Sequence, residues 1–162
     1  PGRPGAARPV TLLVDEAPAL GYLPDLIPFM GQYRKAGLRV WILTQTMAQL
    51  ASDELYGQTG FKAIFGLCSI KQFFSIREPE VARLVSETAG ERTAKSLRDN
   101  PSGESAGEVG VPLIRPEKVR GLAKWRQIII MDEMASPIKA RLIPYFKRRD
   151  WNKMADPNPY RK

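Results

Sequence analysis

The chain has 162 residues, and its 25 Lys and Arg against 17 Asp and Glu give a formal net charge of +8. This length suits a domain of ordinary size with a hydrophobic core, and the excess of cations favours a polyanionic partner such as nucleic acid, nucleotide or an anionic membrane surface. The sequence contains no histidine and one cysteine, which excludes Ser-His-Asp and Cys-His catalysis, His-based metal sites, multi-cysteine zinc sites and an internal disulfide. Any chemistry must therefore rest on carboxylates.

The first third of the chain alternates apolar runs with helical patterns. Residues 1–9 are rich in Pro and Gly and predict a linker. Short apolar runs indicate buried strands, and an apolar stripe followed by Gly37 indicates a helix that ends there. The expected elements are strands at 10–14 and 38–43 and helices at 25–35 and 47–55.

The rest of the chain continues this alternation. The expected elements are strands at 63–67, 73–76, 127–131 and 138–146, a helix at 79–89 and a helix or turn at 116–122. We therefore expect an α/β fold with a mostly parallel sheet flanked by helices and an antiparallel C-terminal β-hairpin. The polar, Gly-rich segment 98–110 predicts a flexible surface loop.

The tail from 147 to 162 is basic. Contact with DNA, contact with anionic lipid, or surface solubility could each explain such a charge run, and solubility is the commonest explanation. With Trp151 and Tyr160 alone, the tail has too few aromatic residues to indicate a stacking platform.

Polar side chains follow the first two predicted strands. Asp15 and Glu16 end the first strand, and Thr44 and Gln45 end the second. If these strand ends lie side by side, they meet at the edge of the sheet where α/β folds bind ligands. A γ-phosphate and its attacking water require such a combination of metal ligand, general base and amide. Taken alone, Asp15 and Glu16 are equally compatible with acids that cap a turn.

Seven segments, in this order and spacing, resemble the TraG-like coupling proteins of type IV secretion and bacterial conjugation, relatives of the FtsK-type hexameric DNA translocases. The resemblance runs from Val10 to Trp151. It is carried by residues 12–21, 33–45, 47–50, 56–57, 85–93, 112–122 and 136–146.

The resemblance implies a role for each strand-end residue. Asp15 would hold Mg²⁺ through water, Glu16 would be the catalytic base that polarises the attacking water, and Gln45, with Thr44 beside it, would read the γ-phosphate of ATP. Arg34 would act across a subunit interface. The alternatives are a solvated helix-end cation for Arg34 and a strand-end hydrogen bond for Gln45.

A second apolar run, 128–131, also ends in an Asp-Glu pair, and pattern alone cannot separate it from the first. The resemblance places it in a C-terminal hairpin away from the nucleotide. Asp132 and Glu133 are therefore expected to be turn acids.

The resemblance further implies that residues 10–146 are the C-terminal portion of a RecA-like motor domain, part of a phosphate-loop NTPase. No phosphate-loop pattern occurs in the chain, so this chain alone should bind ATP very weakly, and whether it is an enzyme by itself stays open. The parent protein would be an ATPase and a homohexamer at the cytoplasmic face of the bacterial inner membrane.

In that setting, hydrolysis of ATP, with Mg²⁺ as its cofactor, would drive single-stranded DNA and attached protein toward a type IV secretion channel. The expected partners are relaxase or relaxosome proteins and channel components. Two alternatives are an FtsK-like or packaging-type DNA translocase and a non-catalytic substrate-docking module.

Overall fold

The computed structural model describes residues 9–98 and 105–154. The chain divides into two compact units between Ser69 and Ile70, which we call unit 1 and unit 2. Within the described ranges, no helix is both long and apolar enough to cross a membrane.

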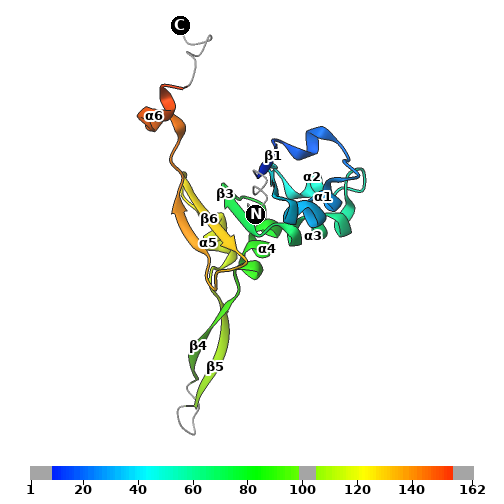
Figure 1. The fold of residues 1–162 in the computed structure, drawn as a ribbon. Coiled ribbons are helices and arrows are strands. Elements are labelled where there is room, and N and C mark those ends of the chain that lie inside the picture. The colour runs from blue at the N-terminus through cyan, green and yellow to red at the C-terminus, as the bar shows by residue number, and fades with distance from the viewer. Residues whose placement is uncertain (1–8, 99–104, 155–162) are drawn as a thin grey trace, which may run out of the picture. The chain divides into compact units, whose positions relative to one another are not determined.

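Unit 1 is built around a parallel strand pair. Its elements are β1 (Val10–Val14), η1 (Ala17–Leu20), α1 (Leu26–Gln32), η2 (Tyr33–Ala36), β2 (Leu38–Ile42), α2 (Met47–Leu50) and α3 (Gly57–Leu67). In the register of the pair, Val10 lies opposite Leu38 and Val14 lies opposite Ile42. The connection from β1 to β2 runs through α1, as parallel pairing requires a crossover (Figure 1).

The core of unit 1 lies where the two strands end. Val14, Ala17 and Leu50 are buried together, and the partly buried Val40, Ile42, Tyr56 and Phe61 pack against them. The Tyr56 hydroxyl accepts a hydrogen bond of 3.2 Å from the N–H of Leu23. This bond ties the loop before α1 to the start of α3.

Unit 2 contains two antiparallel sheets. Its elements are β3 (Ile70–Phe74), α4 (Pro79–Ala89), β4 (Glu91–Arg98), β5 (Ser105–Pro112), α5 (Pro116–Arg120), β6 (Arg126–Met131), β7 (Ile138–Arg141), η3 (Tyr145–Lys147) and α6 (Arg149–Asn152). One sheet has the strand order β3-β6-β7, and β4 and β5 pair with each other (Figure 1).

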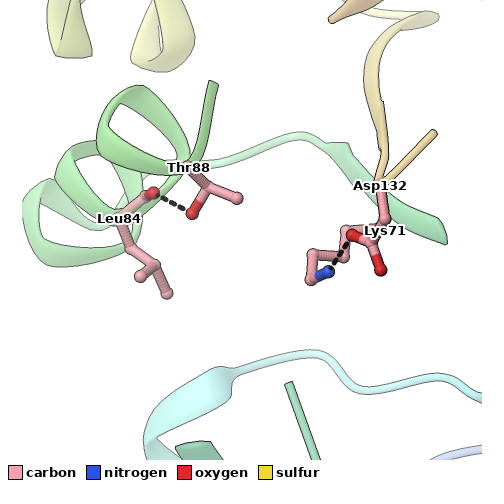
Figure 2. A network of polar contacts seen from close by, with 4 residues as sticks. All are labelled: Lys71, Leu84, Thr88 and Asp132. Atoms are coloured by element: carbon pink, nitrogen blue, oxygen red, sulfur yellow. Dashed lines mark hydrogen bonds and ion pairs between the residues drawn. The ribbon is translucent and has the colours of Figure 1, made fainter. Parts of the chain in front are cut away.

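The core of unit 2 joins its helices to the central strand β6. Val85 of α4, Val119 of α5 and Ile128 of β6 have no exposed side-chain surface. The amide Nε2 of Gln72 in β3 donates a hydrogen bond to Oε1 of the buried Gln127 in β6. Figure 2 shows two further polar contacts in this unit: the Thr88 hydroxyl donates to the Leu84 carbonyl at 2.6 Å, and Lys71 contacts Asp132.

The α/β class and the C-terminal hairpin, formed by β6 and β7, are confirmed. Among the described strands, however, parallel pairing is limited to β1 with β2, and all other pairs are antiparallel.

Four predicted elements are wrong in type or length. The strand predicted at 138–146 ends at Arg141, and Tyr145 and Phe146 belong to η3 instead. Residues 63–67 form the end of α3 instead of a strand, because a run of five apolar residues is too short for periodicity to separate the two. The strand predicted at 73–76 runs from Ile70 to Phe74. The helix predicted at 47–55 ends at Leu50, where Ala51 leaves the helix and turns follow.

The polar segment 98–110 is also not a loop throughout. Residues 105–110 belong to β5 and pair with β4, because cross-strand hydrogen bonds can form whatever the polarity of the side chains. Residues 99–104 lie outside the described part, as do 1–8 of the predicted linker and 155–162 of the basic tail.

The first two strands, β1 and β2, are less buried than predicted. Val10, Leu13 and Trp41 are 63%, 59% and 65% exposed, although the apolar runs at 10–14 and 38–43 predict buried strands. A parallel pair is buried on both faces only when further layers cover it. In unit 1 the tightest packing is at the carboxyl ends of the strands, around Val14.

Candidate functional site

The candidate site begins with the backbone at the carboxyl ends of β1 and β2. The N–H of Leu43 donates to the carbonyl of Val14 at 2.9 Å, and the N–H of Ala17 donates back to the carbonyl of Leu43 at 2.9 Å. These two bonds continue the parallel pairing past the strands. Asp15 and Glu16 therefore emerge at the same edge of the sheet as Thr44 and Gln45.

Glu16 has an unusual backbone conformation. Its φ of 55° and ψ of 62° are left-handed, a conformation that costs an L residue roughly 1–2 kcal/mol. The turn lets the chain reverse directly from β1 into η1, where Ala17 is buried in the core. Strained backbone of this kind persists only where the surrounding structure holds it in place, and it is found most often at functional sites.

Glu16 and Gln45 line one cavity of about 520 Å³. This volume is within the range of small-molecule sites, roughly 300–1,000 Å³. The other lining residues come from η1, α2 and the turns after α2: Pro18, Ala19, Gln49, Ser52, Glu54 and Leu55. None of these lining residues is Lys or Arg, so a bound phosphate would need its positive partners from elsewhere.

Thr44 and Thr46 fix the chain between Gln45 and α2. The Thr44 hydroxyl donates to the carbonyl of Thr46 at 2.7 Å. The Thr46 hydroxyl oxygen accepts from the N–H of Gln49 at 3.4 Å and so caps α2. The cap points to how Gln49 comes to line the cavity. In the sequence, Thr46 is a typical helix N-cap residue, and it could have drawn attention to Gln49 three positions later. No comparable pattern marks Ser52, Glu54 or Leu55 as lining residues.

The structure does not bring all the predicted residues to the cavity. Asp15 is exposed beside Glu16 and is not among the lining residues. Arg34 lies in η2, before β2, whereas Gln45 follows β2. Since the five residues of β2 span roughly 17 Å, Arg34 lies at the opposite end of the strand from the cavity of its own chain.

The residues present fit a magnesium–nucleotide site only in part. Among the described residues, no group of three His, Cys, Asp or Glu side chains could hold a metal ion. Mg²⁺ needs fewer protein ligands than that, since it keeps several waters and often binds one or two carboxylates together with substrate phosphates. Asp15 and Glu16 can supply such carboxylates.

The second Asp-Glu pair has a structural role. Asp132 and Glu133 lie in the turn between β6 and β7. The Lys71 ammonium donates to the Asp132 carboxylate at 3.0 Å, and the Lys71 side chain is only 9% exposed (Figure 2). The prediction of turn acids is confirmed, and the ion pair ties this turn to β3.

Fold and strand ends together define an α/β protein with a candidate ligand site at the carboxyl edge of a parallel pair. The family model described as "TraM recognition site of TraD and TraG" matches residues 9–124, and the chain belongs to this family. It is 25% identical to the type IV secretion system-coupling protein VirD4 of Bartonella quintana, over 93% of this chain and 25% of the relative. For VirD4 of Bartonella henselae, the identity is 23% over 87% of this chain and 23% of the relative.

The solved structures that the chain resembles are of the bacterial conjugative coupling protein TrwB. An unbound form superimposes with a TM-score of 0.73 at 22% identity and covers 88% of this chain and 33% of TrwB. TrwB in complex with ADP and Mg²⁺ gives a TM-score of 0.70 at 22% identity, over 88% and 32% of the two chains. This likeness confirms the predicted fold class. The chain spans about a quarter of the VirD4 relatives and a third of TrwB.

Proposed function

We propose that this chain is the C-terminal portion of the motor domain of a type IV secretion coupling ATPase. The observation that carries the proposal is that Glu16 and Gln45 line one cavity at the ends of β1 and β2, in a chain of the coupling-protein family. In the parent protein, a homohexamer at the cytoplasmic face of the inner membrane, ATP hydrolysis would deliver single-stranded DNA and attached protein to the secretion channel.

Each polar residue at the strand ends has one task in this proposal. The Glu16 carboxylate accepts a hydrogen bond from the attacking water and orients it. Asp15 would hold Mg²⁺ through water, and the ion would neutralise phosphate charge when nucleotide is bound. Gln45 contacts the γ-phosphate through its amide, and Thr44, bonded to the Thr46 carbonyl, keeps Gln45 in place.

The phosphate cradle must come from outside this chain. The sequence has no phosphate-loop pattern, and the lining of the cavity includes no cation. Arg34 sits at the other end of β2, which suits the proposed contact with the nucleotide of a neighbouring subunit. Solved TrwB structures include complexes with ADP and Mg²⁺ and with non-hydrolysable GTP and ATP analogues, which supports a nucleotide as the ligand here.

The two Asp-Glu pairs provide a matched test in the full-length protein. We expect Glu16→Gln to lower kcat for ATP hydrolysis by at least about 100-fold, the contribution typical of a positioned acid or base, and Asp15→Asn to weaken Mg²⁺-dependent turnover. Glu133→Gln and Asp132→Asn, the same changes after β6, should leave kcat within about twofold of wild type. If Glu16→Gln hydrolyses ATP at the wild-type rate, the assignment of these residues to a nucleotide site is wrong.

A second candidate function is docking of a protein partner. The family description names recognition of TraM, so this region would bind a relaxosome protein, whether or not it takes part in hydrolysis. Titration calorimetry of the 162-residue chain with relaxosome proteins tests this function. Binding by the chain together with no ATPase activity in any full-length variant would favour docking over the motor.

A further inference from the structure

Exposed aromatic rings gather near the end of unit 2. Trp125 precedes β6, Tyr145 and Phe146 lie in η3, and Trp151 lies in α6. Their exposed fractions are 38%, 57%, 53% and 49%. We call these four residues, together with Lys124 and Arg148, the aromatic–basic cluster.

The pairing of β6 with β7 brings three of the rings together, those of Trp125, Tyr145 and Phe146, and Trp151 follows in the next helix. The N–H of Leu142 donates to the carbonyl of Trp125 at 2.8 Å, which continues the hairpin and carries η3 back to Trp125. The ring centroids of Trp125 and Phe146 are 6.3 Å apart, and those of Tyr145 and Phe146 are 5.6 Å apart. The ring planes cross at 78° and 81°, so the rings do not stack on one another.

Two cations lie over these rings, and the surrounding sequence is rich in further cations. The Lys124 ammonium lies 5.3 Å from the ring centre of Trp125, and the Arg148 guanidinium lies 4.7 Å from that of Trp151. From 139 to 154 the chain carries one acid, Asp150, against six cations: Lys139, Arg141, Lys147, Arg148, Arg149 and Lys153. Asp150 pairs with Arg148 at 2.9 Å, and this hydrogen bond lowers the pKa of the Asp150 carboxyl. Asp150 therefore offsets a single cation.

Solubility does not account for this surface. A charge run needs no aromatic residues to keep a protein in solution, whereas exposed apolar groups rimmed by charge mark sites of interaction. Half-exposed rings among Arg and Lys match single-stranded nucleic acid, whose bases stack on rings and whose phosphates bind cations. The rings of Trp125, Phe146 and Tyr145 pack edge to face, and the Trp151 ring carries the Arg148 guanidinium. Rings held in this way present planes that suit flat bases better than fluid lipid.

We propose that the aromatic–basic cluster binds single-stranded nucleic acid, with bases on the rings of Tyr145 and Trp151 and phosphates on the neighbouring cations. A duplex binds more weakly, because its paired bases cannot stack on the rings. The proposal deepens the proposed function, in which single-stranded DNA is the cargo, but binding here requires no hydrolysis.

The test uses the 162-residue chain and a fluorescent oligo(dT) of about 20 nucleotides, longer than the roughly 4–16 nucleotides that one such surface covers. We expect Tyr145→Leu to weaken binding about 5- to 150-fold, as the loss of one stacked base implies. Tyr33→Leu, at a tyrosine of unit 1 that is 47% exposed, is the matched control and should bind like wild type. Arg149→Gln should reduce the slope of log K against log salt by about 1, whereas Arg39→Gln should not.

Circular dichroism and thermal melting of each variant show that it is folded, and Arg149→Gln provides a second readout if Tyr145→Leu unfolds. Equal affinity for duplex together with no effect of Tyr145→Leu would overturn the proposal, as would an absence of binding. Binding to phosphatidylglycerol vesicles but not to oligo(dT) would also overturn it, in favour of a lipid surface.

The full-length protein separates this inference from the motor. Loss of oligo(dT) binding in Tyr145→Leu with normal ATP hydrolysis in Glu16→Gln would uphold the cluster and remove the proposed site. The opposite result is that Glu16→Gln loses ATP hydrolysis while Tyr145→Leu still binds oligo(dT) like wild type. That result would uphold the proposed nucleotide site and overturn the role of the aromatic–basic cluster.

Discussion

Replacing Glu16 by Gly should give a more stable protein than replacing it by Ala. Both substitutions remove the carboxylate and its contacts, so their difference isolates the backbone, which is left-handed at this position. Glycine adopts this conformation without the clash that an L side chain suffers. Alanine usually gives a more stable protein than glycine at a given position, and we expect the reverse at residue 16.

The size of the effect follows from two opposing terms. Relief of the left-handed conformation contributes roughly 1–2 kcal/mol, and the greater freedom of glycine in the unfolded chain offsets about 0.4–1 kcal/mol of it. We expect the free energy of unfolding of Glu16→Gly to exceed that of Glu16→Ala by about 0.5–1 kcal/mol. For a chain of this length, that difference corresponds to about 1–4 °C in Tm.

Thermal unfolding followed by circular dichroism, with urea titration as a second method, measures the difference. Glu16→Gln keeps the Cβ atom and the strain, and its Tm should match wild type, while hydrolysis in the full-length protein is lost. If Glu16→Ala is as stable as Glu16→Gly or more so, Glu16 is not held in the left-handed region. The idea that strain places its carboxylate at the cavity would then fall.

Three further substitutions test the packing around the site and in unit 2, each by urea unfolding. Ile128→Ala should cost about 2–5 kcal/mol and Ile128→Val about 0.5–1.5 kcal/mol, because Ile128 is fully buried; equal costs would show that the site does not keep a cavity. Leu50→Ala should cost about 2–5 kcal/mol because Leu50 is 3% exposed between Val14 and Ala17, whereas Leu67→Ala, at a residue 38% exposed, should cost clearly less. Thr46→Ala removes the cap of α2 and should cost about 0.5–2 kcal/mol, and Thr46→Ser should restore most of it; a silent Thr46→Ala would mean that the cap bond is not formed.

The sequence predicted the parallel pair and the strand-end residues because each has a local signal. Val10–Val14 and Leu38–Ile42 are apolar runs that stop at polar residues, and both form strands within one residue of the predicted ends. Gly37, with φ of 88°, ends η2 where predicted, since a left-handed residue there favours glycine. These features depend only on residues close in sequence, and they can therefore be predicted from the sequence alone.

Features that depend on distant contacts were missed. Residues 63–67 are apolar enough for a strand, but Ile64 is buried as part of α3, and no local signal decides between the two. Trp125 and Phe146 are twenty-one positions apart, and only the pairing of β6 with β7 reveals that their rings are neighbours. The basic tail by itself has too few aromatic residues to predict stacking, because Trp125, Tyr145 and Phe146 lie outside it. The roles of Asp15, Glu16, Arg34, Thr44 and Gln45 remain predictions.

The exposed position of Trp41 gives unit 1 its own optical reporter. The chain has three tryptophans, and the other two, Trp125 and Trp151, can be replaced by Phe to leave Trp41 as the sole emitter at long wavelength. At 65% exposure in β2, its indole should emit at the red end of the tryptophan range and be quenched readily by iodide. Any segment or subunit that covers this strand would shift the emission to the blue and slow the quenching, so the assembly of the sheet could be followed in real time without a label.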